Sequence, residues 1–387
     1  TAHDDQYNRR NNLVFGDISK SMVHELPDHH ILWESHAATA DERLFPTVCS
    51  IQWVDKLLYT ASYDGTVKVW NTDLRSSKIP ICFRTLKHDS NVRVMGVSDS
   101  MPHLVATGTA HSFNLWNLQQ NPPTPKRLEI YRDPRQKAGI VLEPTVLAWG
   151  PTAATKSYLV GGMAEHVPGA DHDDEKKFQV VALGHLGMWK VTESSIMMCK
   201  LRGAYSQNTF DLKWHPSLPR FATGSRYSQG MNLPLRSRSA VQIFNIESAD
   251  RVIATHKFAC SAADMNEVTF CPMDSTYVTA SCTDGSTYVW DARYGDHPIH
   301  KLNHGSSLKP LNPRFARELT DYGVRVALWG TTIDQFYTGS SDGCLKRWDI
   351  RRATEDALVA NTAQLPDGIV SGAFSADKSQ LLLGDYG

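Results

Sequence analysis

The chain has 387 residues, of which 41% are hydrophobic and 21% charged, and its formal net charge is −1. These values fit a globular protein with a sizeable core and argue against a whole-chain attraction to nucleic acid or to an acidic membrane, and no apolar run approaches the ~20 residues that cross a bilayer. Seven cysteines without a CxxC pair favour reduced thiols in a nuclear or cytosolic protein over a disulfide framework.

Residues 1–46 are predicted to form a short N-terminal extension. Three apolar residues in it recur at every fourth position: Ile18, Met22 and Leu26. This spacing places them on one face of a helix over residues 17–26, which either packs on its own domain or docks onto a partner. A further apolar run predicts a strand over residues 31–35.

A unit of short strands then repeats through residues 47–387. Three copies share one phrase, in which Asp-Gly is followed by Trp five residues after the Gly: Asp64-Gly65 to Trp70, Asp284-Gly285 to Trp290, and Asp342-Gly343 to Trp348. Asp-Gly favours a two-residue hairpin, so each copy predicts strand, tight turn, strand. No unit can bury both faces of its sheet alone, and the units must therefore pack on one another around an axis.

The repeated phrase, preceded by small residues, resembles the WD-repeat family. Three units are clear and four are degenerate, and the resemblance implies an all-β, seven-bladed WD-repeat β-propeller. In such rings an N-terminal strand commonly completes the last blade, and residues 31–35 are the candidate. The last unit stops at its turn, so we expect this blade to be incomplete at residue 387 and the natural chain to continue.

Two insertions interrupt the repeats. Gly162–Lys177 is rich in acidic residues and histidine, and a solvated acidic loop is favoured over a metal site because the spacing matches no zinc or calcium motif. Arg226–Arg238 is basic and polar. It is either a plain surface loop or a contact for an acidic peptide, a phosphate or a nucleic-acid backbone. The residues that would make that contact are Arg226, Tyr227, Arg236 and Arg238.

No catalytic constellation is present in the sequence. GxSxG, HExxH, a Walker loop and a dinucleotide fingerprint are all missing, so we expect no enzyme activity, no cofactor and no metal. Several histidines lie near strand ends and turns: His88, His111, His185, His215 and His304. The family resemblance implies that they form hydrogen bonds within a blade.

Two consecutive units extend Trp-Asp by an Arg two residues later. These are Trp290-Asp291-Ala292-Arg293 and Trp348-Asp349-Ile350-Arg351, the latter followed by Arg352. The pair resembles the Trp-Asp-x-Arg signature of WD-repeat substrate receptors of cullin-RING ubiquitin ligases. These receptors bind a multi-propeller adaptor, the large subunit of the damaged-DNA-binding complex. The resemblance implies that Arg293, Arg351 and Arg352 contact the adaptor and that the Ile18–Leu26 helix docks. The alternative is a salt bridge at the rim that serves only the fold.

These observations predict a non-enzymatic protein-interaction scaffold. The first expectation is a substrate receptor or adaptor subunit of a cullin-RING ligase, nuclear and chromatin-linked, with protein partners and no membrane; the cytoplasm is the alternative location. A structural WD-repeat subunit of another nuclear assembly, in transcription or RNA export, is the second. A propeller that binds nucleic acid through its basic loop is the third.

Overall fold

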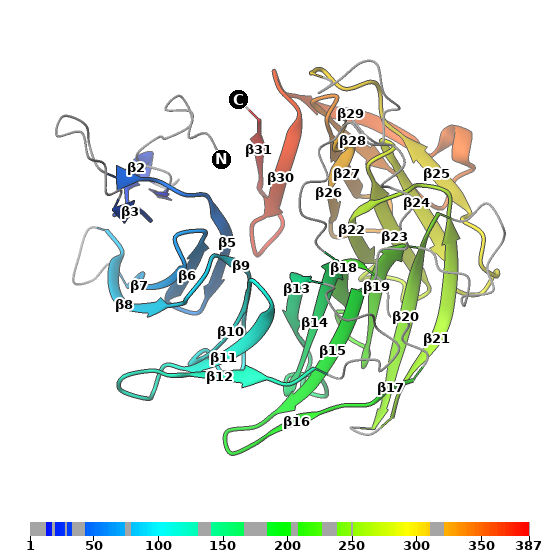
Figure 1. Ribbon diagram of the computed structural model, residues 1–387. Helices are drawn as coiled ribbons and strands as arrows, with labels where there is room; N and C mark the ends of the chain where they lie inside the picture. Colours follow the sequence, from blue (N-terminus) through cyan, green and yellow to red (C-terminus); the bar gives the residue numbers. More distant parts are fainter. Residues whose placement is uncertain are drawn as a thin grey trace. The chain divides into compact units, whose positions relative to one another are not determined.

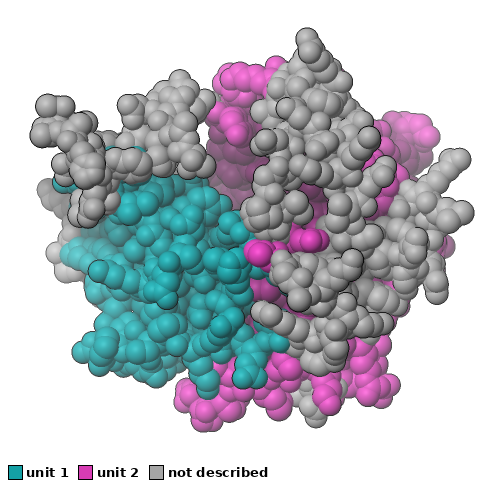
Figure 2. Space-filling view, viewed as in Figure 1, with its two compact units in different colours: residues 1–130, 142–149 teal, residues 131–141, 150–387 magenta. Residues whose placement is uncertain are grey.

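The computed structural model describes most of the chain: residues 13–17, 20–27, 29–32, 43–73, 79–130, 141–165, 184–202, 208–226, 238–248, 251–309 and 321–386. Within these ranges the chain is built mainly from β-strands, with the short 3₁₀ turn η5 (Thr354–Asp356) near the last sheets and no α-helix. None of these segments is therefore a helix of the length and apolarity that span a membrane. The chain divides into two compact units, residues 1–130 with 142–149, and residues 131–141 with 150–387 (Figure 2).

The first unit contains two four-stranded antiparallel sheets (Figure 1). The first sheet consists of β5 (Val48–Val54), β6 (Leu57–Ser62), β7 (Thr66–Asn71) and β8 (Ile81–Lys87), paired in chain order. The second consists of β9 (Val92–Val97), β10 (Leu104–Thr109), β11 (Ser112–Asn117) and β12 (Pro125–Leu128). Strand β13 (Leu142–Trp149) packs against β9, where the indole nitrogen of Trp149 donates to the Gly96 carbonyl at 3.1 Å.

The second unit repeats the same arrangement. Its strands are β14 (Tyr158–Glu165), β15 (Gly184–Val191) and β16 (Ile196–Met198); β17 (Leu201–Arg202), β18 (Thr209–Trp214), β19 (Arg220–Arg226), β20 (Ser239–Ser248) and β21 (Arg251–Cys260); β22 (Met265–Phe270), β23 (Tyr277–Cys282), β24 (Ser286–Asp291) and β25 (His300–Asn303); β26 (Val324–Trp329), β27 (Phe336–Ser340), β28 (Cys344–Trp348) and β29 (Leu358–Gln364); and the pair β30 (Ile369–Phe374) and β31 (Leu381–Asp385). The groups β18–β21, β22–β25 and β26–β29 each pair antiparallel in chain order, and β17 adds a parallel edge to β21. Short strands joined by hairpins into four-stranded sheets are the predicted blades.

The aromatic residue of each Trp strand lies in the core. Trp70, Trp189 and Trp290 are fully buried, because alternate side chains of a strand point to opposite faces and these point inward. Phe244 occupies the same place in its sheet and stacks on Phe221, with ring centroids 5.0 Å apart. Replacement of Trp by Phe therefore keeps the packing of that blade.

The Asp-Gly turns are one residue longer than the two-residue hairpin that the sequence predicts. Three residues separate β23 from β24, and β6 and β7, like β27 and β28, are spaced in the same way. Gly65, Gly285 and Gly343 have φ of +77°, +77° and +71°. A three-residue hairpin ends on a residue in the left-handed region, which glycine adopts without a steric penalty. The hairpins themselves were predicted correctly, and the length of their turns was not.

The helix predicted over residues 17–26 is wrong. Strand β1 (Val14–Asp17) pairs antiparallel with β2 (Met22–Glu25), and Ser21 between them has φ +50°. Leu13 and Leu26 are buried in one cluster with Leu58 and Trp70 of the first blade. A hairpin brings these two leucines to the same end, with the Leu26 amide donating to the Leu13 carbonyl at 3.0 Å, so tertiary packing prevails over the four-residue period.

The strand predicted over residues 31–35 is present in its first two residues. Strand β3 (Ile31–Leu32) pairs antiparallel with β4 (Arg43–Leu44). Residues 33–35 lie outside the described ranges, and the role of this strand in completing the last blade stays a prediction.

Candidate partner-binding site at the Trp-Asp-x-Arg turns

The two Trp-Asp-x-Arg turns begin where a buried strand ends. Trp290 and Trp348 are in the core, and the aspartates that follow, Asp291 and Asp349, are only 2% and 4% exposed. Each carboxylate accepts from the backbone N–H two residues later, at 2.9 Å for Arg293 and 3.2 Å for Arg351. A buried aspartate that bonds to its own chain in this way fixes the direction in which the chain leaves the sheet.

Each arginine forks onto the aspartate of its own motif. Nε of Arg293 donates to Oδ1 of Asp291 at 2.9 Å and Nη2 donates to Oδ2 at 2.6 Å. The corresponding distances from Arg351 to Asp349 are 2.9 and 3.1 Å. The geometry is bidentate, which holds the guanidinium plane in one orientation.

The electrostatics of the two turns agree with this geometry. Burial would raise the pKa of Asp291, but the hydrogen bonds and charge of Arg293 outweigh it, so the pKa lies below its usual value. For Asp349 the hydrogen bond from Arg351 is the leading cause of a lowered pKa. The hydrogen bond that Arg293 donates to Asp291 likewise raises the pKa of Arg293. Both aspartates are therefore ionised and both arginines charged at neutral pH.

Both guanidinium groups remain accessible. The side chains of Arg293 and Arg351 are each 55% exposed, although their aspartates are buried. Arginine has five N–H donors, and the fork uses two of them, so donors remain for another molecule. Arg352 adds a third cation, 54% exposed, whose Nε donates to Asp349 at 3.2 Å.

Two tyrosine side chains lie beside Arg293. The guanidinium carbon of Arg293 lies 5.6 Å from the ring centroid of Tyr294, which is 72% exposed, and 6.0 Å from that of Tyr277. Ile299 and Leu358 are exposed as well. Arginine beside exposed tyrosine is a composition that protein interfaces favour.

His300 connects the two turns. It lies on β25, which follows the first motif, and its Nε2 is 2.8 Å from the carbonyl oxygen of Ile350 in the second motif. Its Nδ1 is 2.9 Å from Oγ1 of Thr354 in η5. The side chain of Ile350 is itself buried in a hydrophobic cluster. The turns are thus parts of one local structure, which sequence reasoning did not identify because His300 belongs to neither motif.

The remaining predicted partner residues belong to the N-terminal segment of the first unit. Leu26 is buried in the first blade, and Met22 is 38% exposed on β2. Ile18 lies outside the described residues. The docking helix for a partner is therefore replaced by a hairpin that packs on its own domain.

The two insertions are described only in part. Arg226 ends β19 and Arg238 precedes β20, and both have interactions within the chain. Tyr227 and Arg236 lie outside the described residues, as does most of the acidic insertion, of which residues 162–165 belong to β14. The ligand role of the basic loop stays a prediction.

Histidine networks inside the blades confirm part of the prediction for the histidines. Nδ1 of His304 lies 3.1 Å from both oxygens of Asp342 and Nε2 lies 2.7 Å from Oγ1 of Thr338, which accepts from Nε1 of Trp348 at 2.7 Å. His88 similarly reaches Thr107 at 3.0 Å.

Sequence reasoning missed one histidine of this kind. His29 is fully buried and reaches Asp64 at 2.9 Å and Thr60 at 2.8 Å. Its position 35 residues before Asp64, close to the 38 between His304 and Asp342, is the signal that would have found it. His29 therefore ties the described part of the N-terminal segment to the first blade.

Comparisons with known proteins agree with this architecture. The family model described as "WD domain, G-beta repeat" matches residues 45–71. Rik1-associated factor 1 of Schizosaccharomyces pombe (strain 972 / ATCC 24843) is 25% identical over 394 residues, which cover 98% of this chain and 54% of that protein. The chain thus spans about half the length of this curated relative.

Solved structures show the same fold. The Dos1 propeller has a TM-score of 0.70 at 21% identity. The match covers 95% of this chain and 82% of the Dos1 chain. U3-55K and the RRP9 WD40 repeats have TM-scores of 0.55 and 0.54, each at 15% identity. Each match covers 88% of this chain, and the matches cover 88% of the U3-55K chain and 87% of the RRP9 chain. The chain is a WD-repeat β-propeller. The number of seven blades is consistent with its sheets and stays a prediction.

Proposed function

We propose that this protein is a non-enzymatic scaffold that serves as a substrate receptor or adaptor subunit of a nuclear, chromatin-linked cullin-RING ubiquitin ligase. The observation that supports the proposal is the pair of ordered, half-exposed arginine forks at Arg293 and Arg351. Fold alone does not specify function, so the proposal depends on this site.

Pre-ordering makes the site suited to a protein partner. Each guanidinium is held by a buried carboxylate before any partner arrives, so little side-chain freedom is lost on binding. The remaining N–H donors can bind carbonyl or carboxylate groups of the adaptor, and Tyr294 adds apolar contact area. The relative named for its association with Rik1 supports a role within an assembly.

The test is affinity purification of the tagged chain from nuclear extract with Arg293→Ala plus Arg351→Ala. We expect the multi-propeller adaptor to be retained by the wild type and lost from the double variant. Arg251→Ala is the matched control, because Arg251 is also half-exposed and paired with a carboxylate, at 2.9 Å from Glu247. Failure of the wild type to retain the adaptor would refute the ligase assignment.

One observation favours the second candidate, a structural subunit of another nuclear assembly. Each arginine already has a carboxylate partner within its own turn, as a purely structural ion pair would. Equal adaptor recovery with the wild type and the double variant would support this candidate. Nucleic-acid binding through residues 226–238 is the third candidate, and it predicts an affinity that falls steeply with salt.

A further inference from the structure

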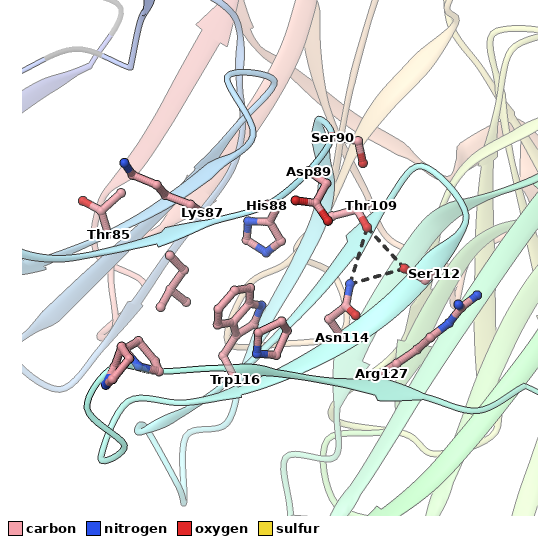
Figure 3. A pocket seen from close by; sticks show the side chains of 14 residues that line it. Thr85, Lys87, His88, Asp89, Ser90, Thr109, Ser112, Asn114, Trp116 and Arg127 are labelled. Carbon is pink, nitrogen blue, oxygen red and sulfur yellow. Dashed lines mark hydrogen bonds between the residues drawn. The ribbon is translucent and has the colours of Figure 1, made fainter.

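A groove lies in the first unit between β8 and the segment that carries β12. It has a volume of about 610 Å³. Thr85 and Lys87 of β8 line one side, and three prolines line the other: Pro122, Pro123 and Pro125. Figure 3 shows the Trp116 ring between the strand of Thr85 and Lys87 and the strand of Arg127. The indole is 4% exposed, so the groove has an aromatic floor.

The charges of the groove favour an anionic group. Lys87 and Arg127 both line it, and neither has a carboxylate partner among the residues that the structure describes. Asp89 is the acidic lining residue, and one carboxylate against two cations leaves a net positive charge. His88 is already engaged between the two sheets of the first unit, with Nδ1 3.1 Å from the Gly65 carbonyl and Nε2 3.0 Å from Thr107.

Polar side chains in the groove are weakly engaged with one another. The amide nitrogen of Asn114 donates to Thr109 at 3.4 Å and to Ser112 at 3.3 Å, and the two hydroxyl groups are 3.3 Å apart. These distances are at the long end of the hydrogen-bond range. A peptide backbone in the groove can replace them with shorter bonds.

Strand β8 extends the groove with an apolar row. Ile81 and Phe83 are 52% and 51% exposed, and exposed side chains alternate with less exposed ones along β8 as far as Lys87. The pairing with β7 shifts register opposite Val69 and Trp70, so this row is defined by exposure and not by a single face of the sheet. From Ile81 to Lys87 the row is about 20 Å long at the usual rise of a strand. Moreover, β8 is the last strand of its sheet, and no described strand pairs with its outer edge.

We propose that β8 and this groove bind an extended peptide of about seven residues, a length that follows from the strand rise. The peptide adds along the free edge of β8, places apolar side chains on Ile81 and Phe83, and places a carboxylate between Lys87 and Arg127. Edge addition supplies backbone hydrogen bonds, and the two ends of the row supply specificity. This surface belongs to the first unit and is independent of the arginine forks.

Fluorescence anisotropy on the whole chain tests the proposal. The probes are fluorescein-labelled seven-residue peptides with leucine at alternate positions and two aspartates at one end, in both chain directions, and the same peptides with lysine in place of aspartate. We expect an aspartate peptide to bind and the lysine peptides not to bind. The variant Lys87→Glu plus Arg127→Glu should bind the aspartate peptide about tenfold or more weaker than the wild type does, and it should bind the lysine peptide instead.

Two further variants separate the groove from general surface charge. Lys126→Glu changes a neighbouring exposed cation on β12 that does not line the groove, and it should leave binding unchanged. Phe83→Ser should weaken binding without a change in charge. The proposal is wrong if none of the peptides binds the wild type, or if the double variant binds the aspartate peptide as tightly as the wild type does.

Discussion

At the scale of single residues, the aspartate and the arginine of a Trp-Asp-x-Arg turn contribute differently. Asp291 is 2% exposed and accepts from the backbone N–H of Arg293 as well as from its guanidinium. Arg293 is more than half exposed. The aspartate therefore supports the fold, and the arginine is available to a partner.

This difference predicts the stability of two variants. Asp291→Ala should lower the free energy of unfolding by about 2 kcal/mol, because it leaves a backbone N–H at a buried turn without its acceptor. Arg293→Ala should have a much smaller effect, since an exposed ion pair stabilises little. Urea denaturation followed by tryptophan fluorescence measures both. A loss with Arg293→Ala as large as that with Asp291→Ala would favour the structural alternative over the receptor.

Sequence alone predicted the Arg residues of this site and not their geometry. The Trp-Asp-x-Arg phrase is visible because its spacing is local. A salt bridge of these arginines was one of the two expectations, but its bidentate geometry on the aspartate of the same motif was not predicted, since it depends on how deeply packing buries that aspartate. His300 and His29 were missed because each acts on residues far away in the chain.

At the scale of elements, hairpins were predictable and the N-terminal segment was not. Each Asp-Gly turn and its strands form within a few residues, so the phrase contains its own structure. Residues 17–26 also show a helical period, but Leu13, outside that period, pairs with Leu26 in the core of the first blade. A contact with a later strand decided the structure of this segment.

Side chains on the first strands of several blades also bond to the next blade. Oε1 of Gln52 accepts from Val97 N–H at 2.7 Å, and Oδ2 of Asp211 accepts from Val268 N–H at 2.8 Å. Oε2 of Glu267 accepts from Ala327 N–H at 2.9 Å. These bonds fix neighbouring blades in register, and they could not be read from sequence because the acceptor and donor lie in different repeats.

Glu267 makes one of these bonds dependent on pH. Its carboxyl lines a cavity with Asp211, Lys213 and Arg325. Burial, with a smaller contribution from Asp211, raises its pKa to about 7 against the opposing charge of Lys213. The folded-state pKa is above the unfolded value of about 4.3, so the free energy of unfolding should fall as pH rises from about 4 to about 7.

Glu267→Gln should remove this part of the pH dependence. Glutamine keeps an oxygen acceptor for the Ala327 N–H but does not titrate, so the variant should be more stable than the wild type at neutral pH and show a flatter profile. Urea midpoints across this pH range measure the slope. Glu247→Gln, at an exposed carboxyl on β20, is the control and should keep the wild-type slope. An unchanged slope in Glu267→Gln would contradict the assignment.

At the scale of the whole molecule, the two proposed surfaces share no residue. The arginine forks belong to the second compact unit, and the peptide groove belongs to the first. The forks present fixed cations and a tyrosine to a folded partner, whereas the groove presents a strand edge to an extended segment. A scaffold needs two such surfaces, because it must hold one protein while it binds another.

Independence of the two surfaces is therefore expected. Arg293→Ala plus Arg351→Ala should leave the affinity for the aspartate peptide unchanged, and Lys87→Glu plus Arg127→Glu should leave adaptor retention unchanged, because the effects of substitutions at separate sites without shared partners are additive. Anisotropy and affinity purification on the same four preparations measure both. If either double variant changes both readouts, one of the sites acts through the fold of the chain, and the separate assignment of the forks and the groove is wrong.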